Sequence, residues 1–98
     1  MTLEIARIDI LEGRDAAFEA AAAEAVPLFA AAEGCNGMRI LRSHEVGGRY
    51  WLLVDWRDVA AHEAFRLTPA FARWRELVGG HFAGPPTVEH GLPIGIGF

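Results

Sequence analysis

Four histidines are the side chains of this chain best suited to proton transfer near neutral pH, where an unperturbed imidazole titrates. They are His44, His62, His81 and His90. His62 falls in the first turn of an expected helix, where it could serve as a general base or simply be a solvated residue. Because no HxH or HxxxH spacing brings the histidines together, we predict no metal site.

Other reactive residue types are few. Arg75 could hold an oxyanion, or it could pair with Glu76 or Glu24 on the surface. The single cysteine, Cys35, is more typical of a small buried hydrophobic residue than of a reactive thiol. The chain contains no GxGxxG, GxxxxGK[ST] or GxSxG pattern, so nothing predicts a nucleotide cofactor or a nucleophile elbow.

Composition excludes several classes of partner. A length of 98 residues predicts one domain, 1–98, and the net charge of −4 with scattered arginines argues against nucleic acid and against a basic membrane-binding face. No apolar run approaches a membrane span, and the start of the chain does not resemble a secretory signal. With one cysteine, we expect a cytoplasmic protein. The 52% hydrophobic content is high for so small a domain and predicts a homodimer.

Hydrophobic periodicity defines the elements of the first half. Residues 2–10 alternate isoleucine with charges and predict a strand with one solvated face. Residues 15–32 predict a helix that ends at Gly34 and is kinked at Pro27. Its apolar stripe consists of Phe18, Ala22, Ala25, Phe29 and Ala32. Residues 36–45 predict a second strand, which the turn at 47–48 joins to a third.

The second half repeats the same order. Residues 49–56 predict a central strand with two apolar faces, one of them carrying Tyr50, Leu52, Val54 and Trp56. Asp58 caps a helix to about residue 67, and Thr68-Pro69 restarts it up to Gly79-Gly80. The apolar stripe of the restarted helix consists of Phe71, Trp74, Leu77 and Val78. Residues 87–90 predict a last strand. The resulting fold class is α+β, a ferredoxin-like βαββαβ antiparallel sheet with two helices on one face.

One segment carries a family resemblance. The run from Trp56 to Trp74, with its Asp-Val-Ala-Ala-His and Leu-Thr-Pro-Ala-Phe stretches, resembles the antibiotic biosynthesis monooxygenase family of dimeric α+β barrels. Gly13 after the first strand, Gly34-Cys35 before the second, and Pro86-Thr-Val-Glu-His90 fit the same pattern. The resemblance implies a pocket between helices and sheet and, in quinone-forming members, oxidation of aromatic compounds by molecular oxygen without metal or flavin. It therefore implies no cofactor.

The resemblance also implies roles for individual residues. Trp56 matches a pocket tryptophan, His62 stands where quinone-forming members have a tyrosine, and Arg75 falls near an arginine that holds the anion. We therefore predict His62 and Arg75 as catalytic. We predict that a small apolar or aromatic substrate is contacted by Trp56, Phe65, Leu52 and Tyr50. Leu52 replaces an asparagine of the family and removes a polar contact. The haem-degrading branch has asparagine, tryptophan and histidine where this chain has Ala6, Phe65 and Arg75, so haem degradation is not expected.

Two functions of different classes remain open. One is a cofactor-independent monooxygenase acting on a phenol-type or quinone-type aromatic, and the other is a non-catalytic dimeric protein that binds a small apolar molecule. A pocket with His62 and Arg75 both directed into it favours the enzyme. A filled or entirely apolar pocket favours the alternative.

Overall fold

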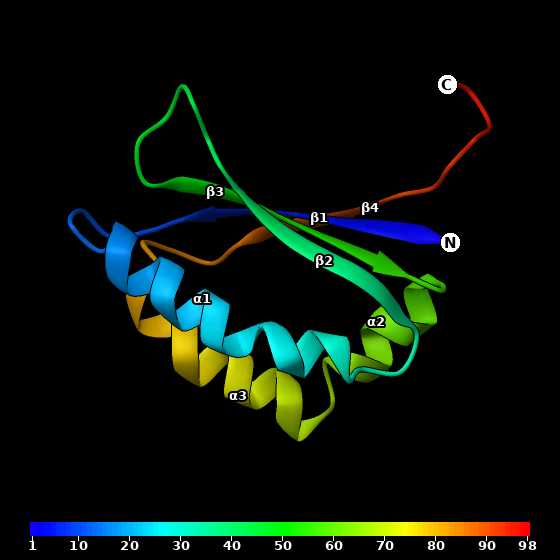
Figure 1. The fold of residues 1–98 in the computed structure, drawn as a ribbon, viewed down its shortest axis with the longest axis horizontal. Coiled ribbons are helices and arrows are strands. Elements are labelled where there is room, and N and C mark those ends of the chain that lie inside the picture. The colour runs from blue at the N-terminus through cyan, green and yellow to red at the C-terminus, as the bar shows by residue number, and fades with distance from the viewer.

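The computed structural model describes residues 1–98 and has the predicted ferredoxin-like topology. Its elements are β1 (Thr2–Asp9), α1 (Asp15–Ala30), β2 (Cys35–Arg42), β3 (Arg49–Trp56), α2 (Val59–Phe65), α3 (Pro69–Val78), the short 3-10 helix η1 (Gly79–His81) and β4 (Thr87–Gly91). The strands form one antiparallel sheet in the order β2-β3-β1-β4. All three α-helices lie on one side of this sheet, with α1 and α3 side by side (Figure 1).

The helices begin where the capping residues predict. The Asp58 side chain accepts a hydrogen bond from the Ala61 amide, and the Thr68 hydroxyl accepts one from the Phe71 amide, with Pro69 at the first helical position. The break at Thr68 separates α2 from α3. Helix α1 continues through Pro27 to Ala30 and buries the predicted residues Phe18, Ala22, Ala25 and Phe29. No helix combines the length and the apolar character needed to cross a bilayer.

Strand β2 ends three residues earlier than the sequence predicts. The Val46 amide donates to the Ser43 hydroxyl, and the Ser43 amide donates to the Arg49 carbonyl, so the chain turns at this point. The α1–β2 turn requires glycine at position 34. Gly34 has a φ of +79°, which L side chains rarely adopt, and a Cβ added there would lie 2.7 Å from the Ala61 Cβ. This turn therefore packs directly against α2.

The face of the sheet under the helices carries the core. Tyr50, Leu52, Val54 and Trp56 of β3 are buried there, as predicted. In β1, the alternate residues Glu4, Ala6 and Ile8 point toward the same face, and Glu4 is only 5% exposed. The expectation that the charges of β1 line a solvated face is therefore wrong for Glu4. Its carboxylate is buried because Trp56 and His62 supply polar partners inside the core.

The opposite face of the sheet is not covered by any helix. It carries a half-exposed apolar strip, which we call the outer strip, made of Leu3, Ile5, Leu41, Trp51 and Leu53. Beyond β4 the chain continues as an apolar tail with exposed Leu92, Ile94, Ile96 and Phe98. In Figure 1 this tail extends on the side of the sheet away from the helices.

Candidate active site

A pocket of about 720 Å³ lies between the covered face of the sheet and helices α2 and α3. Its floor comes from β1 and β3, and its far wall comes from the loop that follows α3. The lining residues are Glu4, Ala6, Ile8, Leu52, His62, Arg66, Phe71, Trp74, Arg75, Gly79, Phe82, Gly84, Pro85, Pro86 and Val88. The pocket is therefore neither filled nor entirely apolar, and both predicted catalytic residues line it.

The elements divide the pocket into an apolar and a polar part. The inward parity of β1 and β3 places Ala6, Ile8 and Leu52 on the floor, and Phe71 and Trp74 project from α3. Glu4 on β1 and His62 on α2 provide a buried polar end. The pocket therefore offers separate surroundings to apolar and to polar atoms.

Two hydrogen bonds and one close contact connect the polar groups of this cluster. The Trp56 Nε1–H donates to Glu4 Oε1 over 2.9 Å, and His62 Nε2 lies 3.2 Å from the same oxygen. The other ring nitrogen of His62, Nδ1, lies 2.8 Å from His90 Nε2. The Trp56 and His62 rings are stacked with 5.2 Å between their centroids. Four elements, β1, β3, α2 and β4, thus hold one polar cluster.

Burial disfavours charge on both members of the central pair. Burial raises the pKa of the Glu4 carboxyl above its ordinary value, although the Trp56 hydrogen bond and the Arg66 charge oppose this. Burial, with smaller contributions from His90 and Arg66, lowers the pKa of His62 to about 4. Burial therefore opposes the state in which the Glu4 carboxyl and the His62 ring are both charged. This position of His62 corrects the view of it as a solvated residue of the first helical turn.

We expect the Glu4→Gln variant to be more acid-sensitive than the unmodified chain. The unfolded chain protonates His62 at pH 6.5, but the folded chain does so only at about 4, so this contribution to stability is lost as pH falls between these values. The raised pKa of Glu4 has the opposite sign, because the folded chain keeps a carboxyl proton that the unfolded chain releases above pH 4.5. In the unmodified chain the Glu4 contribution therefore offsets the His62 contribution as pH falls. Glutamine has no titrating carboxyl, so the variant should show the full loss of stability from His62, about 3 kcal/mol.

Urea unfolding of both chains at several pH values between about 7 and 4 measures this difference. Glutamine has the shape of the glutamate side chain, so the packing around Trp56 is retained. The unmodified chain is expected to show the flatter profile. Equal slopes in the two chains would show that the two pKa shifts do not offset each other.

Two cations face the pocket. Arg66, just after α2, and Arg75, on α3, both line it, and neither takes part in an ion pair within the chain. The surface pairing with Glu24 considered for Arg75 is instead made by Arg73, at 3.8 Å. Arg75 therefore keeps its guanidinium free to meet an anion in the pocket.

Of the four residues predicted to contact a substrate, only one lines this pocket. Trp56 and Phe65 are buried behind the pocket, where their rings pack against each other and Trp56 stacks on His62. Leu52 is on the pocket floor. Tyr50 is outside this pocket. Its hydroxyl donates to Glu19 over 2.6 Å, and burial together with this bond raises its pKa to about 12.

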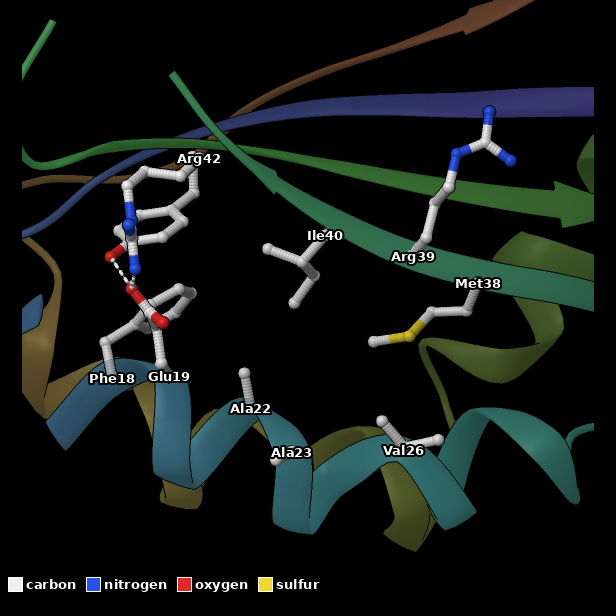
Figure 2. A pocket seen from close by; sticks show the side chains of 10 residues that line it. Phe18, Glu19, Ala22, Ala23, Val26, Met38, Arg39, Ile40 and Arg42 are labelled. Atoms are coloured by element: carbon white, nitrogen blue, oxygen red, sulfur yellow. Dashed lines mark hydrogen bonds and ion pairs between the residues drawn. The ribbon is translucent and has the colours of Figure 1, made fainter. Parts of the chain in front are cut away.

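Tyr50 instead lines a second hollow of about 420 Å³ between α1 and β2. Figure 2 shows Met38 and Ile40 pointing from β2 toward α1, while Arg39 points away from that helix. Arg42 closes one end through an ion pair of 2.6 Å with Glu19. Because Glu19, Arg42 and Tyr50 are already paired with one another and Arg39 points away from α1, this hollow offers less chemistry than the pocket that contains His62.

The other candidate groups do not converge. His62 and His90 are in contact, but His44 is exposed and His81 lies 3.3 Å from an Arg14 nitrogen. No group of three or more histidine, cysteine or acidic side chains is arranged to hold a metal ion. Cys35 is half-buried, and burial raises the pKa of its thiol, which reduces its nucleophilicity.

Comparison with known proteins agrees with this architecture. A family model described as antibiotic biosynthesis monooxygenase matches residues 1–77. The chain belongs to the antibiotic biosynthesis monooxygenase family. Within this family, a Bordetella bronchiseptica protein of known structure, provisionally described as an antibiotic biosynthesis monooxygenase, is 47% identical with a TM-score of 0.92. The match covers 95% of this chain and 96% of that one.

Two more distant relatives extend the comparison. The uncharacterized protein YczJ of Bacillus subtilis is 32% identical over 91 residues, which are 92% of this chain and 96% of YczJ. The structure of Rv0793 from Mycobacterium tuberculosis is 24% identical with a TM-score of 0.80, covers 95% of this chain and 94% of its own, and shows a likeness of fold. Family membership and the Bordetella bronchiseptica neighbour support a general monooxygenase-type role for the chain.

Proposed function

We propose that the chain is a cofactor-independent monooxygenase that oxidises a small phenol with molecular oxygen. The observation that carries the proposal is the composition of one pocket: the Glu4–His62 pair and two unpaired guanidiniums surround a cavity whose other walls are mostly apolar. A phenol offers the matching chemistry, because it has an apolar ring and a hydroxyl that can be deprotonated.

The pocket groups divide the reaction between them. The Glu4–His62 pair takes the phenolic proton, and Arg66 and Arg75 stabilise the phenolate that results. The electron-rich ring then reduces O₂. The O–O bond breaks, one oxygen atom stays bonded to a ring carbon, and the C–H bond at that carbon also breaks. The second oxygen atom takes this hydrogen together with the phenolic proton and leaves as water, so a phenol and O₂ give a quinone and water. The substrate supplies all the electrons, and the proton held by the pair returns to the departing oxygen.

We expect the purified chain to consume oxygen when mixed with small phenols and to transfer one oxygen atom to the product. An oxygen electrode measures uptake across a panel of phenols and hydroxynaphthalenes, and mass spectrometry of products formed under ¹⁸O₂ locates the label. Added catalase distinguishes water from hydrogen peroxide as the second product. Tight binding of a phenol without oxygen uptake would instead favour a non-catalytic small-molecule-binding protein.

We further propose that the chain acts as a homodimer, with the outer strip packed against the same strip of a second copy. An antiparallel sheet is stable when both faces are covered, and the strip leaves apolar surface on the face without helices. The C-terminal tail extends on that side in Figure 1, and its exposed apolar residues can add contacts with the second copy.

The homodimer is expected to bury roughly 1,600 Å² or more in total. Light scattering of the unmodified chain at micromolar concentration should give twice the monomer mass. Leu53→Glu, which introduces a charge at the centre of the outer strip, should give a monomer with an intact far-UV spectrum. A monomeric mass for the unmodified chain at that concentration would rule the dimer out.

A further inference from the structure

The Glu4 carboxylate is held by only one of its two oxygens. Oε1 accepts the Trp56 Nε1–H and lies within reach of His62 Nε2, whereas Oε2 makes no hydrogen bond in the chain. No enclosed side-chain oxygen or nitrogen of this protein lacks a hydrogen-bond partner, so Oε2 is not sealed in the core. Since Glu4 lines the pocket, that is where Oε2 finds space for a partner.

The hydrogen positions follow from the same contacts. A carboxylate oxygen can only accept, so His62 Nε2 carries the hydrogen that faces Oε1. Nδ1 of that neutral ring is then an acceptor, and His90 Nε2 supplies the hydrogen between the two rings. Nδ1 of His62 is thus engaged by His90, while Nε2 lies 3.2 Å from Oε1 without a hydrogen bond to it. The only acceptor of this cluster that stays open toward the pocket is Glu4 Oε2.

We propose that Glu4 is the general base of the proposed oxidation, taking the substrate proton at Oε2, and that Trp56, His62 and His90 are positioning residues for its carboxylate. This inference rests on the proposed function. The phenolic O–H bond breaks, its electron pair stays on the phenol oxygen, and a new O–H bond forms at Oε2. The Trp56 N–H keeps its hydrogen bond to Oε1 throughout, because a protonated carboxyl still accepts at its other oxygen.

The charges around Glu4 are consistent with this role. His62 Nε2 lies 3.2 Å from Oε1, His90 stands opposite Glu4 on β4, and Arg66 and Arg75 line the same pocket as Glu4. Burial raises the pKa of the carboxyl, which brings its base strength closer to that of a phenol. Once the proton has moved, Arg66 and Arg75 face a single anion, the phenolate, beside a neutral carboxyl.

Binding of 4-nitrophenol tests proton transfer without oxygen chemistry, because its phenolate and phenol forms differ in absorption. Under anaerobic conditions near pH 6, the unmodified chain should bind it as the phenolate. Glu4→Gln, whose amide cannot take the proton, should bind the neutral phenol, with the ratio of bound phenolate to bound phenol roughly tenfold lower, as a change of about one unit in the pKa of the bound phenol gives. Asp58→Asn, a variant outside the pocket, serves as the matched control and should keep the phenolate form.

The possible results separate the base from the oxidation. Phenolate bound equally by the unmodified chain and by Glu4→Gln would overturn the assignment of Glu4, and so would failure of the unmodified chain to bind the phenol. Loss of the phenolate form in Glu4→Gln, together with no oxygen uptake on any phenol, would keep Glu4 as the proton acceptor and overturn the monooxygenase instead.

A second variant tests the positioning role of His90. His90→Leu removes the donor to His62 and should lower kcat several-fold while KM stays unchanged, whereas His90→Gln, which restores an N–H donor, should recover part of the rate. The ring ¹⁵N shifts of His62 report its tautomer directly. Protonation of His62 at Nδ1 in the unmodified chain would overturn the hydrogen-bond chain described above.

Discussion

Replacing Arg75 by alanine is expected to lower kcat/KM for a phenolic substrate by roughly 10²–10³, the effect of removing one group that stabilises a developing oxyanion. The side chain lines the pocket and has no ion-pair partner within the chain, so its charge is available to a phenolate. Stability should change little, because Arg75 is exposed on α3. Steady-state oxygen uptake and thermal melting of the same preparations measure both effects.

Arg73 provides the matched control. It stands two residues away on the same helix, is also exposed, and pairs with Glu24 outside the pocket. Arg73→Ala should therefore keep full activity, since an exposed ion pair contributes little even to stability. Equal losses in the two variants would indicate a general effect of positive charge on α3. Full activity of Arg75→Ala would place the anion-binding group elsewhere.

Trp56→Ala is expected to destabilise the fold by about 3–5 kcal/mol, a large part of the roughly 5–10 kcal/mol available to a small domain. The indole is fully buried and packs against Phe65 and His62. Its removal also takes one donor from the buried Glu4 carboxylate, which adds to the cost of burying that group. Denaturant unfolding followed by circular dichroism measures the change.

Trp56→Phe separates packing from hydrogen bonding at this position. Phenylalanine fills most of the space but lacks the N–H, so the variant should fold and lose about 1–3 kcal/mol from the unpaired acceptor. An unchanged unfolding midpoint in Trp56→Ala would contradict the buried position of the indole in the core.

Much of the fold could be predicted from the sequence because its signals are local. The capping residues Asp58 and Thr68, the alternation in β3 and the apolar stripe of α1 each act within a few residues. These patterns specify the element order, and with short connections this order leaves few topologies. The end of β2 was predicted less accurately, because it depends on how the Ser43 side chain bonds in the turn.

The candidate site could be predicted only in part. His62, Arg75 and Leu52 were found through family resemblance, and all three line the pocket. Glu4 was missed because a charged residue in an alternating strand indicates a solvated face. The contrary signal was that Glu4 shares its face of the strand with the apolar residues Ala6 and Ile8. His90 and Arg66 were missed because their roles depend on contacts with residues far away in the sequence. His62 and His90, for example, are 28 positions apart, and such a contact leaves no local signal.

The wall made by Phe82, Gly84, Pro85 and Pro86 has a different character from the rest of the pocket. The ionisable groups stand on strands and helices or, in the case of Arg66, next to a helix end, whereas this wall is a loop, the kind of segment that tolerates substitution and insertion best. Changes there can enlarge, narrow or reshape the space beside the ring of a bound molecule while Glu4 and Arg75 stay in place. Under the proposed function, selectivity and reactivity are therefore separable, and a library randomised over this loop is a direct way to test larger substrates.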